Sequence, residues 1–508
     1  MTYKMAAVYF VTGLLLLLLG IGNAVMALSA TIDIAFIVKS LNPTDLFSTP
    51  SVLGNSMIIT GILSIIQYFT PTNAMLVAIY IFNIHTLTLL PISIFTSIYY
   101  YATIPRLNLA TRQSIAIFAV IVLFYLSTII ISVYIAMQYF TDFITSRHYH
   151  KLSDLKEEQN SDRSINEGEI AFRLSSTKKI RNVAIFQLIC SGVLIASGLA
   201  DLFLFQGLYS NQTFYAGSLL CVTSICGILS EHKNIDEGMI WFGILSRVSR
   251  LICISTIGIN VLAYLNTSAA ALYEDPDNIR SLFICVSVLL VLGFLTSFYI
   301  TLKLTSNIGF FNVISVWKKR RAEQSYKPEL CSLTTVLSTI QFLAALFLWA
   351  SGVAAMLYGK AQHLSFSTFS TASWVIVAAK VGVSLNRMKS VQIDIPYVAI
   401  SILSTLLLLN NMIVTGMEYY RLYKSDITIR LSIQITFGCI IGAAIISFLI
   451  TFFSAIKIAC ANDITCRKIT PTSKATNKRK LTKDMGSRNM LTTNEDNNEQ
   501  EDSRESAN

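Results

Sequence analysis

Twelve long runs of apolar residues limit what this chain can fold into. A helix crosses the hydrocarbon core of a bilayer with roughly 20 consecutive apolar residues. The predicted spans are 7–36, 52–68, 75–100, 114–140, 183–205, 214–230, 239–264, 281–303, 334–357, 366–385, 396–415 and 431–456. These runs are continuous and lack the two-residue alternation of a membrane β-barrel. The sequence therefore predicts an all-α polytopic membrane protein with about twelve transmembrane helices.

The low charge content argues against the soluble classes of protein. Only 13% of the 508 residues are charged and 53% are apolar, whereas ordinary soluble domains carry about 25% charged residues. This excludes a soluble enzyme, a nucleic-acid-binding domain and a disordered protein as the main interpretation. The formal net charge of +10 is then a signal of membrane topology. We expect a lipid bilayer around the chain and no nucleic-acid partner.

Three long polar segments divide the twelve spans into three blocks of four. The predicted organisation is a four-span unit at 1–145, a cytoplasmic linker at 146–181, a second unit at 182–303, a second linker at 304–331, a third unit at 332–457 and a disordered cytoplasmic tail at 458–508. Because four spans return the chain to the same side of the membrane, all three units share one orientation. The units form either a pseudo-trimer or separate beads with little contact.

The distribution of cations indicates the orientation. With the N-terminus inside, most of the 39 Lys and Arg residues fall in inside segments, as the positive-inside rule requires. Two glycosylation sequons begin at Asn211 and Asn266, and both fall in predicted outer loops. We therefore expect cytoplasmic termini, in the plasma membrane or in an endomembrane of the secretory pathway.

The first span has an alternative interpretation. Lys4, the Leu run and the small residues at 27–30 also resemble a signal peptide. The apolar run is longer than the 7–15 residues of such peptides, and the repeat described next favours a retained span. Cleavage would leave eleven spans and an outside N-terminus.

Matching positions suggest that the three blocks are repeats. Gln187 precedes Gly198 by eleven residues in block two, and Gln341 precedes Gly352 by the same distance in block three. Block one has Gly22-Asn23-Ala24 at the equivalent place but lacks the Gln. Other marks shared by the blocks are the second-span glycines Gly61, Gly227 and Gly382 and the fourth-span arginines Arg112, Arg280 and Arg430.

Block two carries a family-like pattern over about 120 residues. Gln187 lies early in its first span, followed by Gly192 and Gly198, and its second span ends Cys226-Gly227-Ile228-Leu229-Ser230-Glu231-His232-Lys233-Asn234. This resembles the membrane-spanning four-domain subfamily A, the family of the B-lymphocyte tetraspan antigen, in which a Ser-Gly-rich stretch and a Glu-Lys turn end the second span. The resemblance implies four-helix units, cytoplasmic termini, oligomerisation and roles in surface signalling or ion flux.

No catalytic or cofactor motif stands out, so we expect no enzyme activity, no cofactor and no metal site. Polar residues within spans are costly to bury and are functional candidates by default. Lys380 either lines a hydrated path, pairs with a carboxylate such as Asp201, or snorkels to the interface. Arg247 and Arg250 share one helical face and are expected to snorkel. His85 is either a packing residue or a gating residue.

Two faces of small residues predict close helix packing. One consists of Gly192, Ala196 and Ala200, and the other of Gly438 and Gly442. Their spacing does not specify whether the packing lies within a unit, between units or between chains.

Two further features are expected at the inner membrane face. Lys318, Lys319, Arg320 and Arg321 are adjacent cations that either attract anionic lipid headgroups or serve only as a topology determinant. Cys460 and Cys466 follow the last span and are palmitoylation candidates, or else unmodified thiols.

Two functions fit these patterns. The first is a tetraspan-like scaffold or regulator of membrane signalling or trafficking, with other membrane proteins or further copies of the chain as partners. The second is a channel or secondary transporter with a path through the helix bundle and an unassigned ion or small molecule. Transporters usually have helices broken at corresponding places, whereas Pro91 and Pro396 do not correspond. We therefore expect the scaffold. A third function, a membrane-embedded enzyme, is less well supported, because the sequence has no cluster of His, Asp and Glu.

Overall fold

A computed structural model describes most of the apolar part of the chain. The described residues are 3–37, 43–69, 71–106, 116, 118–138, 167–204, 210–233, 236–270, 276–306, 328–357, 362–388, 391–424 and 431–461. Nearly all of them are helical, and twelve helices among them are long and apolar enough to cross a membrane. The prediction of an all-α polytopic protein with about twelve transmembrane helices is confirmed.

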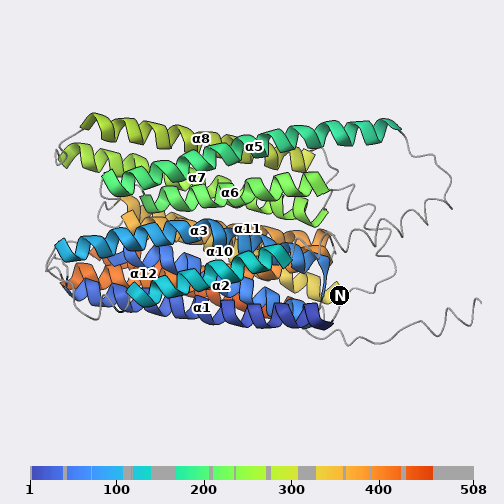
Figure 1. The fold of residues 1–508 in the computed structure, drawn as a ribbon, viewed down its shortest axis with the longest axis horizontal. Helices are drawn as coiled ribbons and strands as arrows, with labels where there is room; N and C mark the ends of the chain where they lie inside the picture. Colours follow the sequence, from blue (N-terminus) through green and yellow to red (C-terminus); the bar gives the residue numbers. More distant parts are fainter. Residues whose placement is uncertain are drawn as a thin grey trace, which may run out of the picture.

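The helices of the first block are α1 (Tyr3–Ile37), α2 (Pro43–Phe69), α3 (Asn73–Arg106) and the span Phe118–Gln138. The second block has α5 (Glu167–Leu204), α6 (Ser210–Lys233), α7 (Asp236–Ala270) and α8 (Pro276–Ser306). The third has α10 (Pro328–Leu357), α11 (Gln362–Met388), α12 (Val391–Lys424) and α13 (Leu431–Ala461). Helix α5 therefore includes the last part of the predicted linker 146–181, and Figure 1 shows it projecting beyond the bundle.

Many hydroxyl side chains in these helices donate hydrogen bonds to the backbone of their own helix. Thr60 Oγ1 donates to the carbonyl oxygen of Ser56 at 2.7 Å, and Ser64 Oγ donates to that of Thr60 at 2.8 Å. Such bonds to the preceding turn satisfy the hydroxyl within the helix. This matters in a bilayer, where no water is available to do so.

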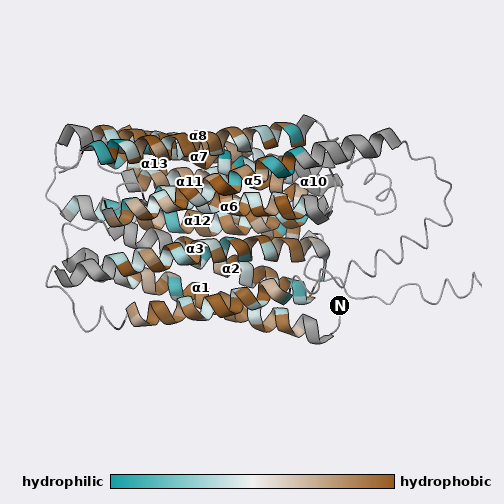
Figure 2. Ribbon diagram, turned by 45° about the horizontal axis from the view of Figure 1, so that its top comes forward, coloured by the Kyte–Doolittle hydropathy of each residue, from teal (hydrophilic) through white to brown (hydrophobic). Residues whose placement is uncertain are grey.

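The helices form an inner and an outer group. The inner helices are the second and third of each block: α2, α3, α6, α7, α11 and α12. Between 50% and 78% of the residues in their spans are buried, against 28–39% in the outer spans. Outer residues such as Leu18, Ile130 and Leu343 are exposed apolar side chains. In Figure 2 the ribbons of α1 and α8 are coloured mostly as hydrophobic residues, as a lipid environment requires.

The contacts between helices follow a regular order. Within each block, consecutive described helices pack together, and α5 also contacts α8 as α10 contacts α13. Between blocks, α3 contacts α6, α7 contacts α11, and α12 contacts α2. Each of these three contacts joins the third helix of one block to the second helix of another, and the series closes on itself. The described helices therefore form one bundle and not separate beads.

Candidate functional site

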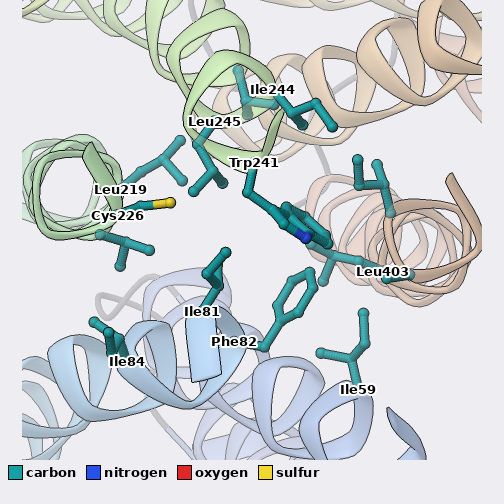
Figure 3. Close-up of a cluster of buried hydrophobic side chains, with 14 of the residues drawn as sticks. Ile59, Ile81, Phe82, Ile84, Leu219, Cys226, Trp241, Ile244, Leu245 and Leu403 are labelled. Atoms are coloured by element: carbon teal, nitrogen blue, oxygen red, sulfur yellow. The ribbon is translucent and has the colours of Figure 1, made fainter. Parts of the chain in front are cut away.

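The centre of the bundle is filled by apolar side chains from all three blocks. Ile59 and Phe82 come from the first block, Trp241 from the second and Leu403 from the third, as Figure 3 shows. The rings of Phe82 and Trp241 meet edge to face, with centroids 5.5 Å apart. Aromatic pairs in this geometry add to the free energy gained by burying their area. The packed centre therefore joins the three blocks.

A group of polar and aromatic side chains lies about one helical turn along α3 from Phe82. We call it the junction cluster: Ser56, His85, Thr86, Tyr215 and Trp374. Ser56 Oγ lies 3.1 Å from His85 Nδ1 and 3.0 Å from Thr86 Oγ1. The His85 and Tyr215 rings are 6.5 Å apart between centroids. Trp374 Nε1 donates a 2.8 Å hydrogen bond to Tyr215 Oη. All three blocks thus contribute a side chain here.

His85 is the one residue of the junction cluster that the sequence analysis had singled out. Its side chain is buried, and Nε2 makes no hydrogen bond to the described part of the chain. A buried ring nitrogen ordinarily has a hydrogen-bond partner. Nε2 is therefore a buried polar atom whose hydrogen bonding the described part of the chain does not satisfy.

Other polar contacts join neighbouring helices within a block. Asn83 Nδ2 donates to the carbonyl oxygen of Ser132 at 2.7 Å, joining α3 to the span Phe118–Gln138. Thr223 Oγ1 and Ser249 Oγ are 2.9 Å apart and join α6 to α7. Hydrogen bonds of this kind contribute to helix association in membranes.

Blocks two and three share an interhelical hydrogen bond. Gln187 Nε2 donates to Ser297 Oγ at 3.0 Å between α5 and α8. Gln341 Nε2, 154 residues later, donates to Thr451 Oγ1 at 2.8 Å between α10 and α13. Both bonds join residues 110 positions apart. The glutamines that the sequence aligned therefore perform the same role in both blocks.

Two glycine contacts also recur between these blocks. In each case an aromatic ring packs where a Cβ atom would otherwise be. The pairs, with the distance from an ideal Cβ to the ring, are Gly198–Phe214 (2.9 Å), Gly352–Phe369 (3.1 Å), Gly227–Phe242 (2.5 Å) and Gly382–Tyr397 (2.6 Å). Each member of a pair lies 154 or 155 residues from its counterpart. A ring approaches each of these four glycines, and at Gly382 the hydroxyl of Ser338 approaches more closely still.

The first block packs differently. Helices α1 and α2 approach so closely that a Cβ on Gly61 would lie 2.6 Å from the carbonyl oxygen of Gly13. One on Gly20 would lie 2.8 Å from that of Gly54. Sequence analysis missed this pair of contacts, although the seven-residue spacing of glycines in both helices was a usable signal.

The cationic residues that were singled out within the spans lie on two inner helices that are in contact. Arg247 and Arg250 on α7 are half-buried, and Lys380 on α11 is exposed. Helices α7 and α11 pack against each other. Arg250 Cζ also lies 5.4 Å from the centroid of the Phe298 ring on α8. The structure thus places the arginine pair and Lys380 on two helices that are in contact.

The structure does not bring Lys380 and Asp201 together. Asp201 is buried near the end of α5, three residues before Leu204, whereas Lys380 lies eight residues before the end of α11. These two helices are the first and second of their blocks, so they run in opposite directions and end on opposite sides of the bundle. The pairing considered from sequence is therefore not formed.

The small-residue faces point away from the described chain. A Cβ on Gly192, Gly438 or Gly442 would meet no atom within 4 Å, and Ala196 is exposed while Ala200 is half-buried. Packing through these faces remains a prediction.

Several predicted sites fall outside the described side chains. Asn211 lies in the first turn of α6, Asn266 in the last turns of α7 and Cys460 near the end of α13, but only their backbone is described. The residues 318–321 and Cys466 lie outside the described residues. Within the described part, no group of three or more His, Cys, Asp or Glu side chains could hold a metal ion.

Comparison with known proteins adds no relative. The chain matches no protein-family model, no curated protein and no solved structure.

Proposed function

We propose that this multi-pass membrane protein is a scaffold or regulator built from three tetraspan-like units fused in one chain. The observation that carries the proposal is the packed apolar centre to which all three blocks contribute. Phe82 and Trp241 are 1% and 0% exposed. A conducting path requires a hydrated or polar lumen, and the centre of this bundle is instead filled.

Three tetraspan-like units are supported by two independent regularities. One is the recurrence of the glutamine and glycine contacts between blocks two and three. The other is the closed series of contacts between the third helix of one block and the second of another. Together they favour a pseudo-trimer of units like those of the membrane-spanning four-domain subfamily A, in the plasma membrane or a secretory endomembrane with cytoplasmic termini.

Ion flux through purified protein in liposomes tests this function. The wild type should be no more permeable to K⁺, Na⁺, Ca²⁺, Cl⁻ or protons than protein-free vesicles. Phe82→Ala removes part of the central packing, and Phe95→Ala on the same helix is its matched control because Phe95 is 40% exposed. Saturable flux through the wild type would contradict the scaffold.

A channel or secondary transporter is the second candidate. It is favoured by the buried Nε2 of His85, which has no hydrogen-bond partner in the described chain and lies where three blocks meet. In this case the wild type would conduct, and His85→Phe would abolish the flux while preserving ring volume. Flux that is unchanged in His85→Phe would remove this site from the path.

A further inference from the structure

Four buried hydroxyl groups gather at one end of block three. Ser338 is on α10, Tyr397 and Ser401 are on α12, and Ser454 is on α13, and each side chain is at most 1% exposed. The Tyr397 hydroxyl lies in interaction range of the three serine hydroxyls. A Cβ on Gly382 of α11 would meet the Ser338 hydroxyl and, at 2.6 Å, the Tyr397 ring. All four helices of the block thus meet at these four residues, which we call the hydroxyl cluster.

The members of the hydroxyl cluster lie at similar depths. Measured by helix rise from the nearest end of its span, Tyr397 lies about 5 Å deep, and Ser338 and Ser454 lie about 6 Å deep. Ser401 is one helical turn further along α12. These span ends belong to one side of the bundle, because α10 and α12 begin where α11 and α13 end. The hydroxyl cluster is therefore only a short distance from the membrane surface, where water is available.

Block two has apolar side chains at three of the four corresponding positions. They are Ala184, Phe242 and Ile300, all of them buried, and each lies 154 or 155 residues before its counterpart in block three. Ser246 corresponds to Ser401, and its hydroxyl donates to the carbonyl oxygen of Phe242 at 2.7 Å. The packing of a four-helix unit therefore does not require free hydroxyl groups at these positions.

The hydroxyl cluster lacks hydrogen bonds of ordinary geometry. None of its four oxygen atoms makes one to the described part of the chain, although an unsatisfied buried hydroxyl is costly and buried polar groups ordinarily have a partner. Hydroxyl groups both donate and accept, and an internal water molecule typically makes about three hydrogen bonds to such groups. A cation would need a carboxylate to offset the loss of its hydration, and the hydroxyl cluster contains none. Its chemistry therefore favours water.

We propose that the hydroxyl cluster binds an internal water molecule, which bridges α10, α12 and α13 through Ser338, Tyr397 and Ser454. This water gives block three a hydrated site where block two is packed with apolar side chains. The site does not depend on whether the protein is a scaffold or a transporter, because a single bound water at one end of a unit is not a path through the bundle.

Radiolytic hydroxyl-radical labelling of the purified full chain in nanodiscs tests the site. X-rays convert a bound water molecule into a radical that oxidises the side chain beside it, so a buried ring is labelled where water is its neighbour. Tyr397 should be oxidised, whereas Phe242, the equally buried ring at the corresponding position of block two, should stay at background. Mass spectrometry gives both yields from one sample. Background labelling of Tyr397 would overturn the proposal.

Two variants separate the bound water from a general opening of the bundle. Ser338→Ala with Ser454→Ile introduces the block-two side chains around Tyr397, and it should lower the oxidation of Tyr397 to the level of Phe242. Labelling of Phe242 reports whether the bundle of this variant is intact, and Ser338→Ala alone provides the same test with a smaller change. Ser373→Ala is the matched control, because this buried hydroxyl on α11 bonds to its own helix, and it should leave the labelling of Tyr397 unchanged. Loss of labelling in both variants, or in neither, would overturn the proposal.

Discussion

Trp374 Nε1 donates a hydrogen bond of 2.8 Å to Tyr215 Oη, joining α11 of the third block to α6 of the second across 159 residues of sequence. Tyr215 also makes an edge-to-face contact with Phe366, with ring centroids 5.8 Å apart. Its hydroxyl is bonded in addition to Ser370. This one side chain therefore contacts α11 at three successive turns, and its neighbour His85 extends the contact to the first block.

Replacing Tyr215 by Phe should destabilise the contact between blocks two and three. The change keeps the ring but leaves the buried indole N–H of Trp374 without its acceptor, which costs about 1–3 kcal/mol. Thermal unfolding in detergent should show a lower midpoint for this variant. Tyr134→Phe is the control, because Tyr134 lies in an outer span and is 46% exposed. Equal midpoints for the two variants would contradict the role of the hydroxyl.

The two glutamine bonds should couple with similar energies. Double-mutant cycles of Gln187 with Ser297 and of Gln341 with Thr451, each to Ala, isolate the two interactions. We expect about 0.6 kcal/mol for each, the average for hydrogen bonds between membrane helices. Because the geometry is the same in both blocks, coupling in one cycle and none in the other would argue against equivalent units.

Gly61 and Gly192 should respond oppositely to the same substitution. A Cβ on Gly61 meets the backbone of α1, whereas one on Gly192 meets nothing within 4 Å. We expect Gly61→Ala to destabilise the protein by about 1–3 kcal/mol through overpacking. Gly192→Ala should be neutral or stabilising by up to about 1 kcal/mol, since Ala is the better helix former. Unfolding midpoints of the two variants provide the comparison, and a larger loss for Gly192→Ala would refute this packing.

The spans were predictable because hydropathy depends on local sequence alone. Burial in lipid demands a run of apolar residues, and all twelve predicted spans overlap those in the described structure. Contacts between blocks were not predictable in this way. Nothing in the spacing of Tyr215 and Trp374 indicates that they meet, because the contact depends on how whole helices pack.

The small-residue faces illustrate a second limit. Gly438 and Gly442 have the four-residue spacing of a packing face, yet a Cβ on either would meet no described atom within 4 Å. Gly54 and Gly61 are spaced by seven residues, and each lies against the backbone of α1. Spacing identifies a helix face that allows close approach, but it does not say whether protein or lipid covers that face.

The orientation of the bundle leads to a final prediction about the sequons. Asn211 begins α6 and Asn266 lies near the end of α7, and since these consecutive helices are antiparallel, both residues lie at the same end of the bundle. If that end is luminal or extracellular, both can be glycosylated, and Asn211→Gln and Asn266→Gln should each increase electrophoretic mobility by one glycan. The double variant should match enzymatically deglycosylated wild type.

The N-terminal end of α1 lies on the opposite side of the membrane from these sequons, because the first helix of a block runs antiparallel to the second. A tag attached there should therefore be protected from protease in intact cells, and cleavage of the tag together with unmodified sequons would reverse the orientation.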